Sequence, residues 1–444
     1  MRLPANDGGT LNRPTVRYRR WHLPEQVRAS SRAEVTPRKT ARGAMMRGLI
    51  GLKADRTSLA VAFAAALAVM LLFGVTVAGA HSASGAATSA RVLDVQVGVT
   101  PAPGTIVVVR RSAGQDSLWS VDPVSKAATE LLSLPFRPER VVRSPGGARL
   151  AYLPTTAGPY VYIYTTTTGV LHRWSLAARG VREVDSLAWL SSSKLLVAGK
   201  STPGYAFYPY RDRLYAFSVT SGRSSRFRDL AGTEPTVSPA DARLVFVRFT
   251  RGGRVASGSP LHWVTEQLFR LKLASATKPR MLLSGRYADG YDIRLFNDPS
   301  LSADGRYLVT STTGSDISVS YMVRSAATGK ALRTIHTELA GHDATAWSNA
   351  ADQVAYWTMT GNSSLSSELH VYDTASATTV SSSGLASVAV SGFAWSSDDA
   401  LLAYSLRGLA SADDQGELWT IDPSSLSAAS AIDLGAGGMP VYVP

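Results

Sequence analysis

One short phrase recurs six times in this chain of 444 residues: a serine, a few small, turn-forming or acidic residues, and then an apolar strand. Four of the five intervals between successive phrases are 46 to 48 residues long, and the third is 64. The six serines are Ser144, Ser191, Ser238, Ser302, Ser348 and Ser396. A period of this size is the signature of a repeat architecture, in which each repeat is one supersecondary unit. The period therefore predicts a repeat fold before any other motif is considered.

A second repeat lies between the serine phrases and consists of a strand, a turn and a polar strand. It occurs seven times, beginning at residues 118, 161, 214, 268, 321, 369 and 418. Turn-forming residues follow many copies, as a hairpin requires, for example residues 220–222 (Thr-Ser-Gly). Each unit then holds four strands: one before the serine, one after it, and the hairpin. Four-stranded blades of about 50 residues around a central channel are a β-propeller.

Seven hairpins but only six serine phrases indicate how the ring closes. The first hairpin follows residues 105–109 (Thr-Ile-Val-Val-Val), which have no inner strand before them, and residues 439–443 (Met-Pro-Val-Tyr-Val) can supply one. Joining both ends of the chain in one blade removes exposed sheet edges. We therefore predict an all-β propeller over residues 104–444 with seven blades, with six blades as the alternative.

Several of the serine phrases resemble a known family. Residues 144–147 (Ser-Pro-Gly-Gly), 302–305 (Ser-Ala-Asp-Gly) and 395–399 (Trp-Ser-Ser-Asp-Asp) resemble the turns of TolB-like periplasmic propellers. The stretch from Gly341-His342 through Trp347-Ser348 to residues 369–373 (Leu-His-Val-Tyr-Asp) is similar to a degenerate WD-repeat. The resemblance covers about residues 104–444 and implies a non-catalytic platform that binds partners. Fold-level likeness does not name a particular partner.

The positive charge of the chain is concentrated in its first 57 residues. The net charge is +13, but residues 1–57 hold 13 Lys or Arg and 4 Asp or Glu, whereas the other 387 residues hold 33 and 29. The repeat region is thus close to electrical balance, and we expect no nucleic-acid partner for it. The absence of cysteine excludes disulfides, thiol catalysis and zinc–thiolate sites.

An apolar segment separates the basic tail from the repeats. Residues 59–80 are 22 mostly apolar residues, which as a helix of about 33 Å are long enough to cross a bilayer core. Because the basic residues precede the segment, the positive-inside rule places the N-terminus in the cytoplasm and the repeats outside. The predicted organisation is a disordered basic cytoplasmic tail (1–56), a transmembrane helix (57–80) and a linker (81–103) before the propeller. The alternative is a signal peptide cleaved near Ala80, after which the protein is secreted.

No motif of a known catalytic or metal centre is present in the sequence. Gly199-Lys200-Ser201 imitates the end of a P-loop, but the first glycine of that motif would fall at Lys194. His342 is expected to have a structural role, and the acidic run 413–417 (Asp-Asp-Gln-Gly-Glu) lacks the ligand spacing of an EF-hand. We therefore predict no enzyme activity, no cofactor and no metal site.

The 64-residue interval indicates where a partner binds. Its excess residues fall in 250–266 and 285–297, and another long loop, 200–213, lies one blade earlier. Loops between the second and third strands lie on the same face of a propeller as the loops between blades, so the three segments should meet on one rim. Aromatic and arginine side chains favour binding hot spots; the alternative is that they pack as a small core of the insertions. The candidate binding residues are Tyr205, Tyr208, Tyr210, Arg211, Arg254, His262, Trp263, Arg286, Tyr287, Tyr291 and Arg294.

Three functions are consistent with this sequence. The first is a membrane-anchored, extracytoplasmic propeller that serves as a non-catalytic scaffold for an envelope or extracellular protein. The second is a module that binds a glycan or another small ligand at the aromatic and arginine rim or in the channel. The third is a propeller hydrolase, which would need acid, base or metal groups converging on the channel. We favour the first.

Overall fold

The computed structural model describes residues 91–201, 212–238, 240–256, 261–275, 277–288, 294–313, 318–339, 345–350, 352–360, 366–382, 385–386, 388–408 and 416–444. Contacts divide the chain into two units, Met1–Ser84 and Gly85–Pro444. The predicted tail and apolar segment lie outside the described residues. Among the residues that are described, no helix is both long enough and apolar enough to span a membrane.

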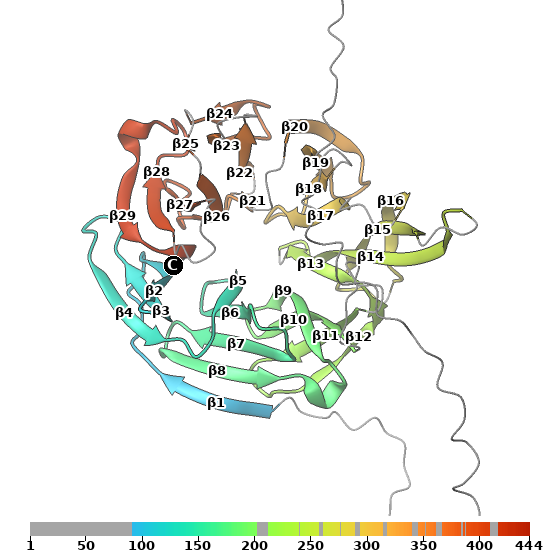
Figure 1. Cartoon of the computed structure of the whole chain (residues 1–444), viewed down its shortest axis with the longest axis horizontal. Coiled ribbons are helices and arrows are strands. Elements are labelled where there is room, and N and C mark those ends of the chain that lie inside the picture. Colours follow the sequence, from blue (N-terminus) through green and yellow to red (C-terminus); the bar gives the residue numbers. More distant parts are fainter. Residues whose placement is uncertain are drawn as a thin grey trace, which may run out of the picture. The chain divides into compact units, whose positions relative to one another are not determined.

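Seven antiparallel sheets follow one another along the second unit and are arranged in a ring (Figure 1). Blade 1 contains β30 (Gly438–Tyr442), β2 (Ile106–Ser112), β3 (Gln115–Val121) and β4 (Ala128–Ser133). Blade 2 contains β5 (Pro138–Arg143), β6 (Arg149–Pro154), β7 (Tyr160–Thr165), β8 (Val170–Ser175) and β1 (Arg91–Val97). Blade 3 contains β9 (Glu183–Ser191), β10 (Lys194–Lys200), β11 (Arg213–Ser218) and β12 (Ser224–Ala231).

The remaining four blades continue around the ring in chain order. Blade 4 contains β13 (Thr233–Ser238), β14 (Arg243–Arg254), β15 (His262–Lys272) and β16 (Arg280–Ala288). Blade 5 contains β17 (Arg294–Leu301), β18 (Tyr307–Thr313), β19 (Ser318–Ser325) and β20 (Ala331–Leu339). Blade 6 contains β21 (Thr345–Trp347), β22 (Gln353–Thr360), β23 (Ser366–Asp373), β24 (Thr379–Ser381) and β25 (Leu385–Ala386). Blade 7 contains β26 (Val388–Trp395), β27 (Leu402–Gly408), β28 (Glu417–Ile421) and β29 (Ile432–Ala436).

These sheets confirm the seven-bladed propeller and exclude the six-bladed alternative. Blade 1 closes the ring as predicted, because β30 at the C-terminus pairs with β2, with Tyr442 opposite Ile106 and Val441 opposite Val107. The amide of Val443 also donates to the carbonyl of Thr105 at 2.9 Å. The helical turns in the described part are two 3₁₀ turns, Ala177–Arg179 and Ala428–Ser430. The two ends of the propeller sequence are therefore held in a single sheet.

The recurring serine holds the turn between the first two strands of a blade. In four of the six copies its hydroxyl accepts a hydrogen bond from the amide five residues later, as in Arg149 to Ser144 at 2.9 Å and Leu401 to Ser396 at 2.9 Å. The same bond joins Tyr307 to Ser302 and Gln353 to Ser348. The repeated serine thus stabilises a turn, in which its side chain takes the place of a backbone hydrogen-bond acceptor.

Apolar packing joins each blade to the next. Seven clusters of buried side chains are found in the described residues, and each draws its members from two neighbouring blades. The cluster between blades 1 and 2 includes Leu118, Tyr152 and Val441, so the C-terminal strand contributes to it directly. Because a blade is a sheet with two buried faces, the ring is completed only when every junction is filled.

Part of the predicted linker is a strand. Residues 81–103 are the predicted linker, and within them Arg91–Val97 forms β1, which pairs antiparallel with β8 and adds a fifth strand to blade 2. Outer strands expose a row of unpaired backbone groups, which a neighbouring extended segment can satisfy.

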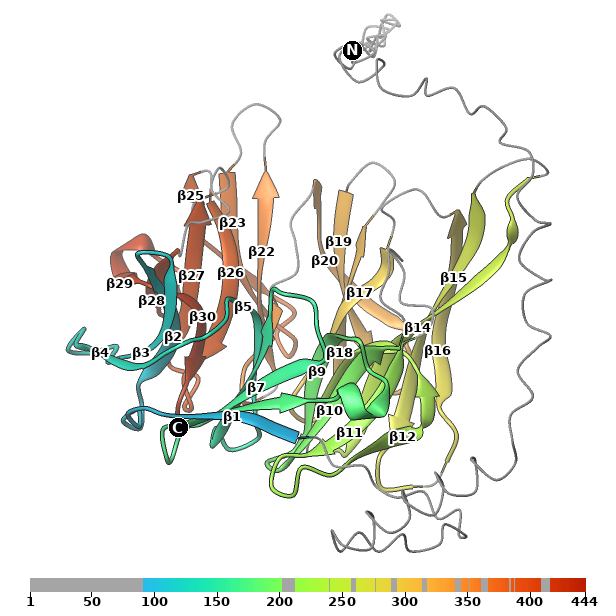
Figure 2. The same ribbon diagram turned by 60° about the horizontal axis from the view of Figure 1, so that its bottom comes forward.

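The long insertions of blade 4 are also largely strand rather than loop. Thr250 pairs with Thr265 and Arg254 with His262, so β14 and β15 continue as a ladder into the insertion. The strand β16 follows them, with Arg286 opposite Thr265 and Ala288 opposite Trp263. The three strands form a projecting extension of blade 4, which is visible in Figure 2.

Candidate functional site

The inner strands of all seven blades surround a central cavity of about 800 Å³. Each inner strand contributes lining residues, from β5 in blade 2 round to β30 in blade 1. A cavity of this volume falls within the range of small-molecule sites. The residues that line this cavity therefore form a second candidate site besides the predicted rim.

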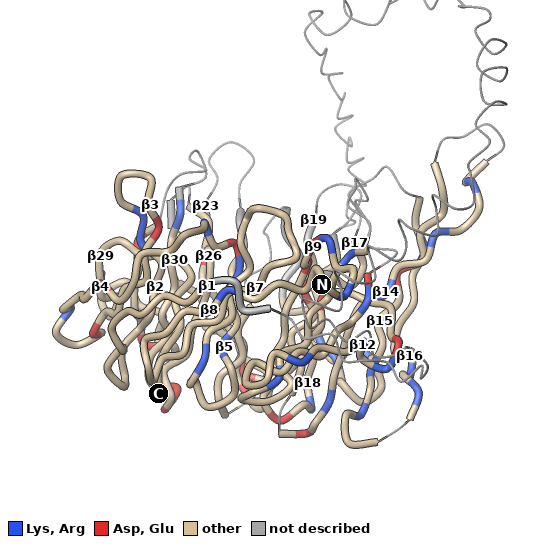
Figure 3. Tube along the Cα trace, turned by 90° about the horizontal axis from the view of Figure 1, so that it is seen from below, with Lys and Arg blue, Asp and Glu red and all other residues tan. Residues whose placement is uncertain are grey.

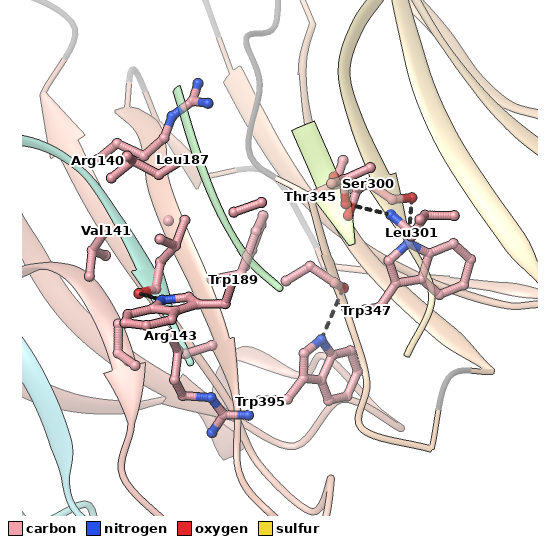
Figure 4. A pocket seen from close by; sticks show the side chains of 18 of the residues that line it. Arg140, Val141, Arg143, Leu187, Trp189, Ser300, Leu301, Thr345, Trp347 and Trp395 are labelled. Atoms are coloured by element: carbon pink, nitrogen blue, oxygen red, sulfur yellow. Dashed lines mark hydrogen bonds between the residues drawn. The ribbon is translucent and has the colours of Figure 1, made fainter. Parts of the chain in front are cut away.

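Three tryptophans of the channel wall tie neighbouring blades together. The indole N–H of Trp347 donates to the carbonyl of Ser300 in the previous blade at 3.0 Å. Trp189 and Trp395 make the equivalent bonds one blade back, to Val142 and Ala346, each at 3.0 Å (Figure 4). These bonds satisfy both the indole N–H groups and the inner-strand carbonyls, so the tryptophans act in assembly of the ring.

Arg143 has the same function where the ring closes. It directly precedes Ser144, as Trp347 precedes Ser348, and its Nη1 donates to the carbonyl of Tyr442 at 3.0 Å. Its Nη2 donates to Oδ1 of Asn349 in blade 6 at 3.2 Å, on the other side of the channel. A cationic side chain thus takes the position that tryptophan holds in other blades and also links two distant blades.

A second link crosses the channel from Arg140. Its Nη2 lies 3.1 Å from Oδ1 of Asp298 in blade 5, and the Asp298 carboxylate raises the pKa of the guanidinium further above its ordinary value. The amide of Asp298 in turn donates to Oε2 of Glu234 at 3.1 Å. Both acidic residues precede a proline and have left-handed φ values, 48° for Glu234 and 38° for Asp298. Non-glycine residues in this region store backbone strain, which the inter-blade contacts must offset.

A cluster of charged side chains lies beside this link in blade 3. The Lys200 ammonium is 2.9 Å from Oε1 of Glu183 and 3.4 Å from Oδ1 of Asp185. Asp212 is only 1% exposed, and both of its carboxylate oxygens are buried with no hydrogen-bond partner among the residues that the structure describes. Burial, followed by repulsion from Asp185, raises the pKa of Asp212 to about 8. The described residues contain no grouping of three or more His, Asp or Glu side chains that could hold a metal.

The predicted binding residues that the structure describes lie on and around the extension of blade 4. Trp263 and Arg286 lie on one face of the sheet, with the Arg286 guanidinium 4.4 Å from the centre of the Trp263 ring. Arg254 is exposed and His262 is half-buried, and they pair at the end of the β14–β15 ladder. Tyr205, Tyr208, Tyr210, Arg211 and Tyr291 lie outside the described residues, and of Arg294 only the backbone position at the start of β17 is described.

Tyr287 lies on the opposite face of the extension and is 6% exposed. Its hydroxyl donates to Oε2 of Glu266 at 3.1 Å. Glu266 is fully buried and also accepts the amides of Leu295 at 2.9 Å and Phe296 at 3.0 Å. This carboxylate attaches the start of blade 5 to the extension, so Tyr287 belongs to the core of this region. The packing interpretation thus applies to Tyr287, whereas Trp263 and Arg286 lie on the other face of the same sheet.

We call the solvent-facing side of the extension the blade 4 face, defined by Arg248, Thr250, Gly252, Trp263, Thr265, Gln267 and Arg286. On this face Trp263 has Gly252 beside it on β14 and Ala288 beside it on β16. A Cβ added to Gly252 would lie 3.2 Å from Cβ of Trp263. Both neighbours are small, Arg286 lies over the indole, and Trp263 is half-buried.

Several residues of this region were not anticipated from the sequence. Arg140, Asp298, Asp212 and Glu266 were not among the candidates, since their partners lie far away in the chain or in an insertion. One sequence signal did exist: Glu234-Pro235 and Asp298-Pro299 both stand four residues before a repeat serine. An acidic residue followed by proline at equivalent repeat positions indicates a shared irregularity of the inner strand.

Comparison with known proteins finds solved structures of low similarity. No protein-family model matches the chain, and no curated protein sequence matches it significantly. The C-terminal WD40 domain of Sif2 is 12% identical with a TM-score of 0.43, covering 80% of this chain and 90% of that one. TolB from Acinetobacter baumannii is 12% identical with a TM-score of 0.40, covering 76% and 82%. The tricorn protease is 13% identical with a TM-score of 0.47; the match covers 80% of this chain but 36% of the protease.

TolB and a WD40 domain, which the sequence was expected to resemble, are thus among the structural neighbours. At such identities and TM-scores they carry no argument about fold, activity or partners. The assignment of the fold rests on the strand pairing of the seven blades.

Proposed function

We propose that this protein is a non-catalytic interaction scaffold: a propeller held outside the cytoplasm by an N-terminal membrane anchor, which binds an envelope or extracellular protein. The observation that carries the binding role is the position of Trp263. It stands on the blade 4 face between two small neighbours, with Arg286 stacked on its ring. Aromatic and arginine side chains of this kind dominate the binding energy of protein interfaces.

The core of the extension does not depend on this tryptophan. Phe249, Val264 and Tyr287 on the other face are buried and belong to the cluster that joins blades 4 and 5. A half-buried tryptophan on the opposite side adds little to that cluster. Preorganisation by Arg286 lowers the entropy cost of binding, because the indole is already held in one orientation.

A non-catalytic role agrees with the use of the polar groups in the channel. The indole N–H groups of Trp189, Trp347 and Trp395 donate to inner-strand carbonyls. Arg140 and Arg143 are bonded across the channel. These groups stabilise the ring through contacts between blades. The anchor is supported by the sequence alone, through the apolar run 59–80 and the basic residues before it.

The binding role is tested by crosslinking and capture from intact membranes with Trp263→Ala. We expect capture of the partner to be lost while the melting temperature changes little. Trp119→Ala is the matched control, because Trp119 is also half-buried beneath an arginine, with Arg110 at 4.8 Å from its ring, but lies on blade 1. Capture that survives Trp263→Ala, or a large fall in melting temperature, contradicts the proposal.

The topology is tested separately by protease treatment of spheroplasts, in which only the cytoplasmic membrane encloses the cell. We expect the propeller to be digested while the spheroplasts are intact. Digestion only after the spheroplasts are lysed would place the propeller in the cytoplasm.

A glycan or another small ligand is the second candidate, favoured by the accessible indole of Trp263 and by the cavity of about 800 Å³. Sugars stack on aromatic rings through contacts that salt does not screen, whereas an arginine-bound partner is released by salt. Titration with neutral oligosaccharides at low and high salt separates the two. Salt-independent binding that is lost in Trp263→Ala would favour the glycan.

A further inference from the structure

We infer that the partner segment bound by the blade 4 face is acidic: an extended piece of protein chain that carries Asp or Glu. This inference rests on the proposed scaffold function and specifies the chemistry of its partner.

The first observation is the distribution of charge among the blades. Residues 233–288, which span blade 4, hold nine Lys or Arg and three Asp or Glu, a net charge of +6. The other residues between 91 and 444 hold 24 and 26, a net of −2. The small positive charge of the propeller region therefore comes from one blade, and Figure 3 shows blue positions along the projecting part of β14.

The acidic residues of blade 4 do not neutralise its exposed face. Glu266 is buried on the opposite side, and Asp241 lies at the turn before β14, 2.5 Å from Arg243. Glu234 is on the inner strand and lines the channel. Arg248 and Arg286 of the blade 4 face are exposed and form no ion pair with any acidic residue in the part of the chain that the structure describes. Their charges are therefore available to a partner.

The geometry of the sheet gives the arginines a defined spacing. Arg248 on β14 stands opposite Gln267, and Arg286 on β16 stands opposite Thr265, so they flank β15 on the same face. With strands about 4.8 Å apart and a same-face repeat of about 6.8 Å, their Cβ atoms are about 12 Å apart. An extended peptide spans this distance in about four residues. Two carboxylates at that separation can each meet one guanidinium, which binds carboxylates in a bidentate manner.

The confined positive charge favours a protein segment over a long polyanion. A nucleic acid or a sulfated glycan follows a continuous basic track, whereas the residues beyond blade 4 have no net positive charge that would continue one. A short acidic segment matches both the size of the blade 4 face and its single aromatic anchor, Trp263. Complementary charge of this kind determines partner choice and the rate of association.

The test is titration of the full-length protein, in detergent, with a fluorescein-labelled peptide that has glutamates four residues apart in a Gly/Ser background. The reference probe is the same peptide with glutamine in place of glutamate. The variant R248E/R286E reverses the charge of the blade 4 face. The matched control is K194E/R223E, which makes the same change in net charge at exposed positions of blade 3.

We expect the glutamate peptide to bind the wild-type protein at least about tenfold more tightly than the glutamine peptide. R248E/R286E should weaken that binding by at least about tenfold, and K194E/R223E by less than about twofold. A rise in salt should also weaken it. Equal weakening in both double variants, or equal binding of the two peptides, would overturn the inference. Tighter binding of single-stranded DNA or heparin at the same face would replace it with a polyanion site.

The capture experiment distinguishes failure of this inference from failure of the proposed function. If Trp263→Ala abolishes partner capture while R248E/R286E leaves it intact, the proposed scaffold function is supported and the inference of an acidic partner segment is wrong. If neither variant affects capture, the blade 4 face is not the binding surface.

Discussion

The stability of this protein should fall as the pH rises from about 4 to about 8 because of one buried carboxyl group. Asp212 is 1% exposed, its oxygens have no hydrogen-bond partner in the described part of the chain, and its pKa is raised from an ordinary value of 3.8 to about 8. Burial contributes most to the shift, and the negative charges of Asp185, Glu183 and Glu234 add to it, whereas Lys200 opposes it. The folded protein therefore keeps a proton at Asp212 that the unfolded chain loses near pH 4.

The sign and the size follow from proton linkage. A group whose pKa is higher in the folded state contributes stability that is complete below its unfolded pKa and is lost as the pH rises through its folded pKa. Each pKa unit corresponds to about 1.4 kcal/mol, so this one site can lower the free energy of unfolding by about 2.7 kcal/mol between pH 5 and pH 7. This is an upper value, because relaxation and hydration around the carboxylate reduce it. Above about pH 8 the contribution becomes flat.

Asp212→Asn replaces the carboxyl by a neutral group of the same shape and should remove this slope. The assay is urea unfolding of the wild type and the variant at four pH values between 5 and 8, with the free-energy difference plotted against pH. We expect the variant to gain stability relative to wild type as the pH rises. Asp229→Asn is the control, since the Asp229 side chain in the same blade is 84% exposed. A difference that is constant with pH, or that runs in the opposite direction, would refute the reasoning.

Three other perturbations test the contacts that hold the fold. Deletion of residues 438–444 removes β30 and the buried side chains of the closing strand, a loss of more than about 5 kcal/mol, so we expect no cooperative thermal unfolding transition. Glu266→Ala leaves the amides of two residues of β17 without their acceptor and should lower the free energy of unfolding in urea by on the order of 3 kcal/mol. Glu266→Gln keeps one acceptor oxygen and should lower it by about a third of that. Trp347→Phe removes the hydrogen bond to the carbonyl of Ser300 and should lower the free energy of unfolding by about 1 kcal/mol. Trp119→Phe, whose indole bonds to the nearby Ser117, should lower it by almost nothing. Equal losses in the two variants would argue against the inter-blade role.

The repeat could be predicted from the sequence because it depends on contacts between residues that are close together in the chain. Ser144 accepts a hydrogen bond from the amide five residues later, and Ser396 accepts the same bond in the last copy. The residues that form each turn are therefore contiguous in the sequence. The strands on either side alternate or run apolar over a few residues, which also requires no knowledge of distant partners. Even ring closure could be predicted, because one hairpin lacked an inner strand and the C-terminus supplied one.

The candidate site could be predicted only in part, because it depends on how strands of the insertion pair with one another. Trp263 and Tyr287 were both predicted to lie at the rim, yet one is on the blade 4 face and the other is buried behind it with Glu266. Which face a residue occupies depends on the strand register in the insertion, and a shift of one residue would exchange the two faces. Composition identified the insertion, but pairing with β15 decided the roles of its residues.

The sequence by itself predicted seven blades, with six as the alternative, together with the way the ring closes and the one interval where the repeat is interrupted, because short-range turns and strand patterns encode these features. Only the tertiary structure decided that Arg140 crosses the channel to Asp298, 158 residues away, and that Asp212 is buried with no hydrogen-bond partner among the described residues. It also decided that Arg248 and Arg286 share one face of blade 4 with Trp263. These features depend on which blades come to lie beside or opposite one another, and a chain acquires them only when all seven are packed into a ring.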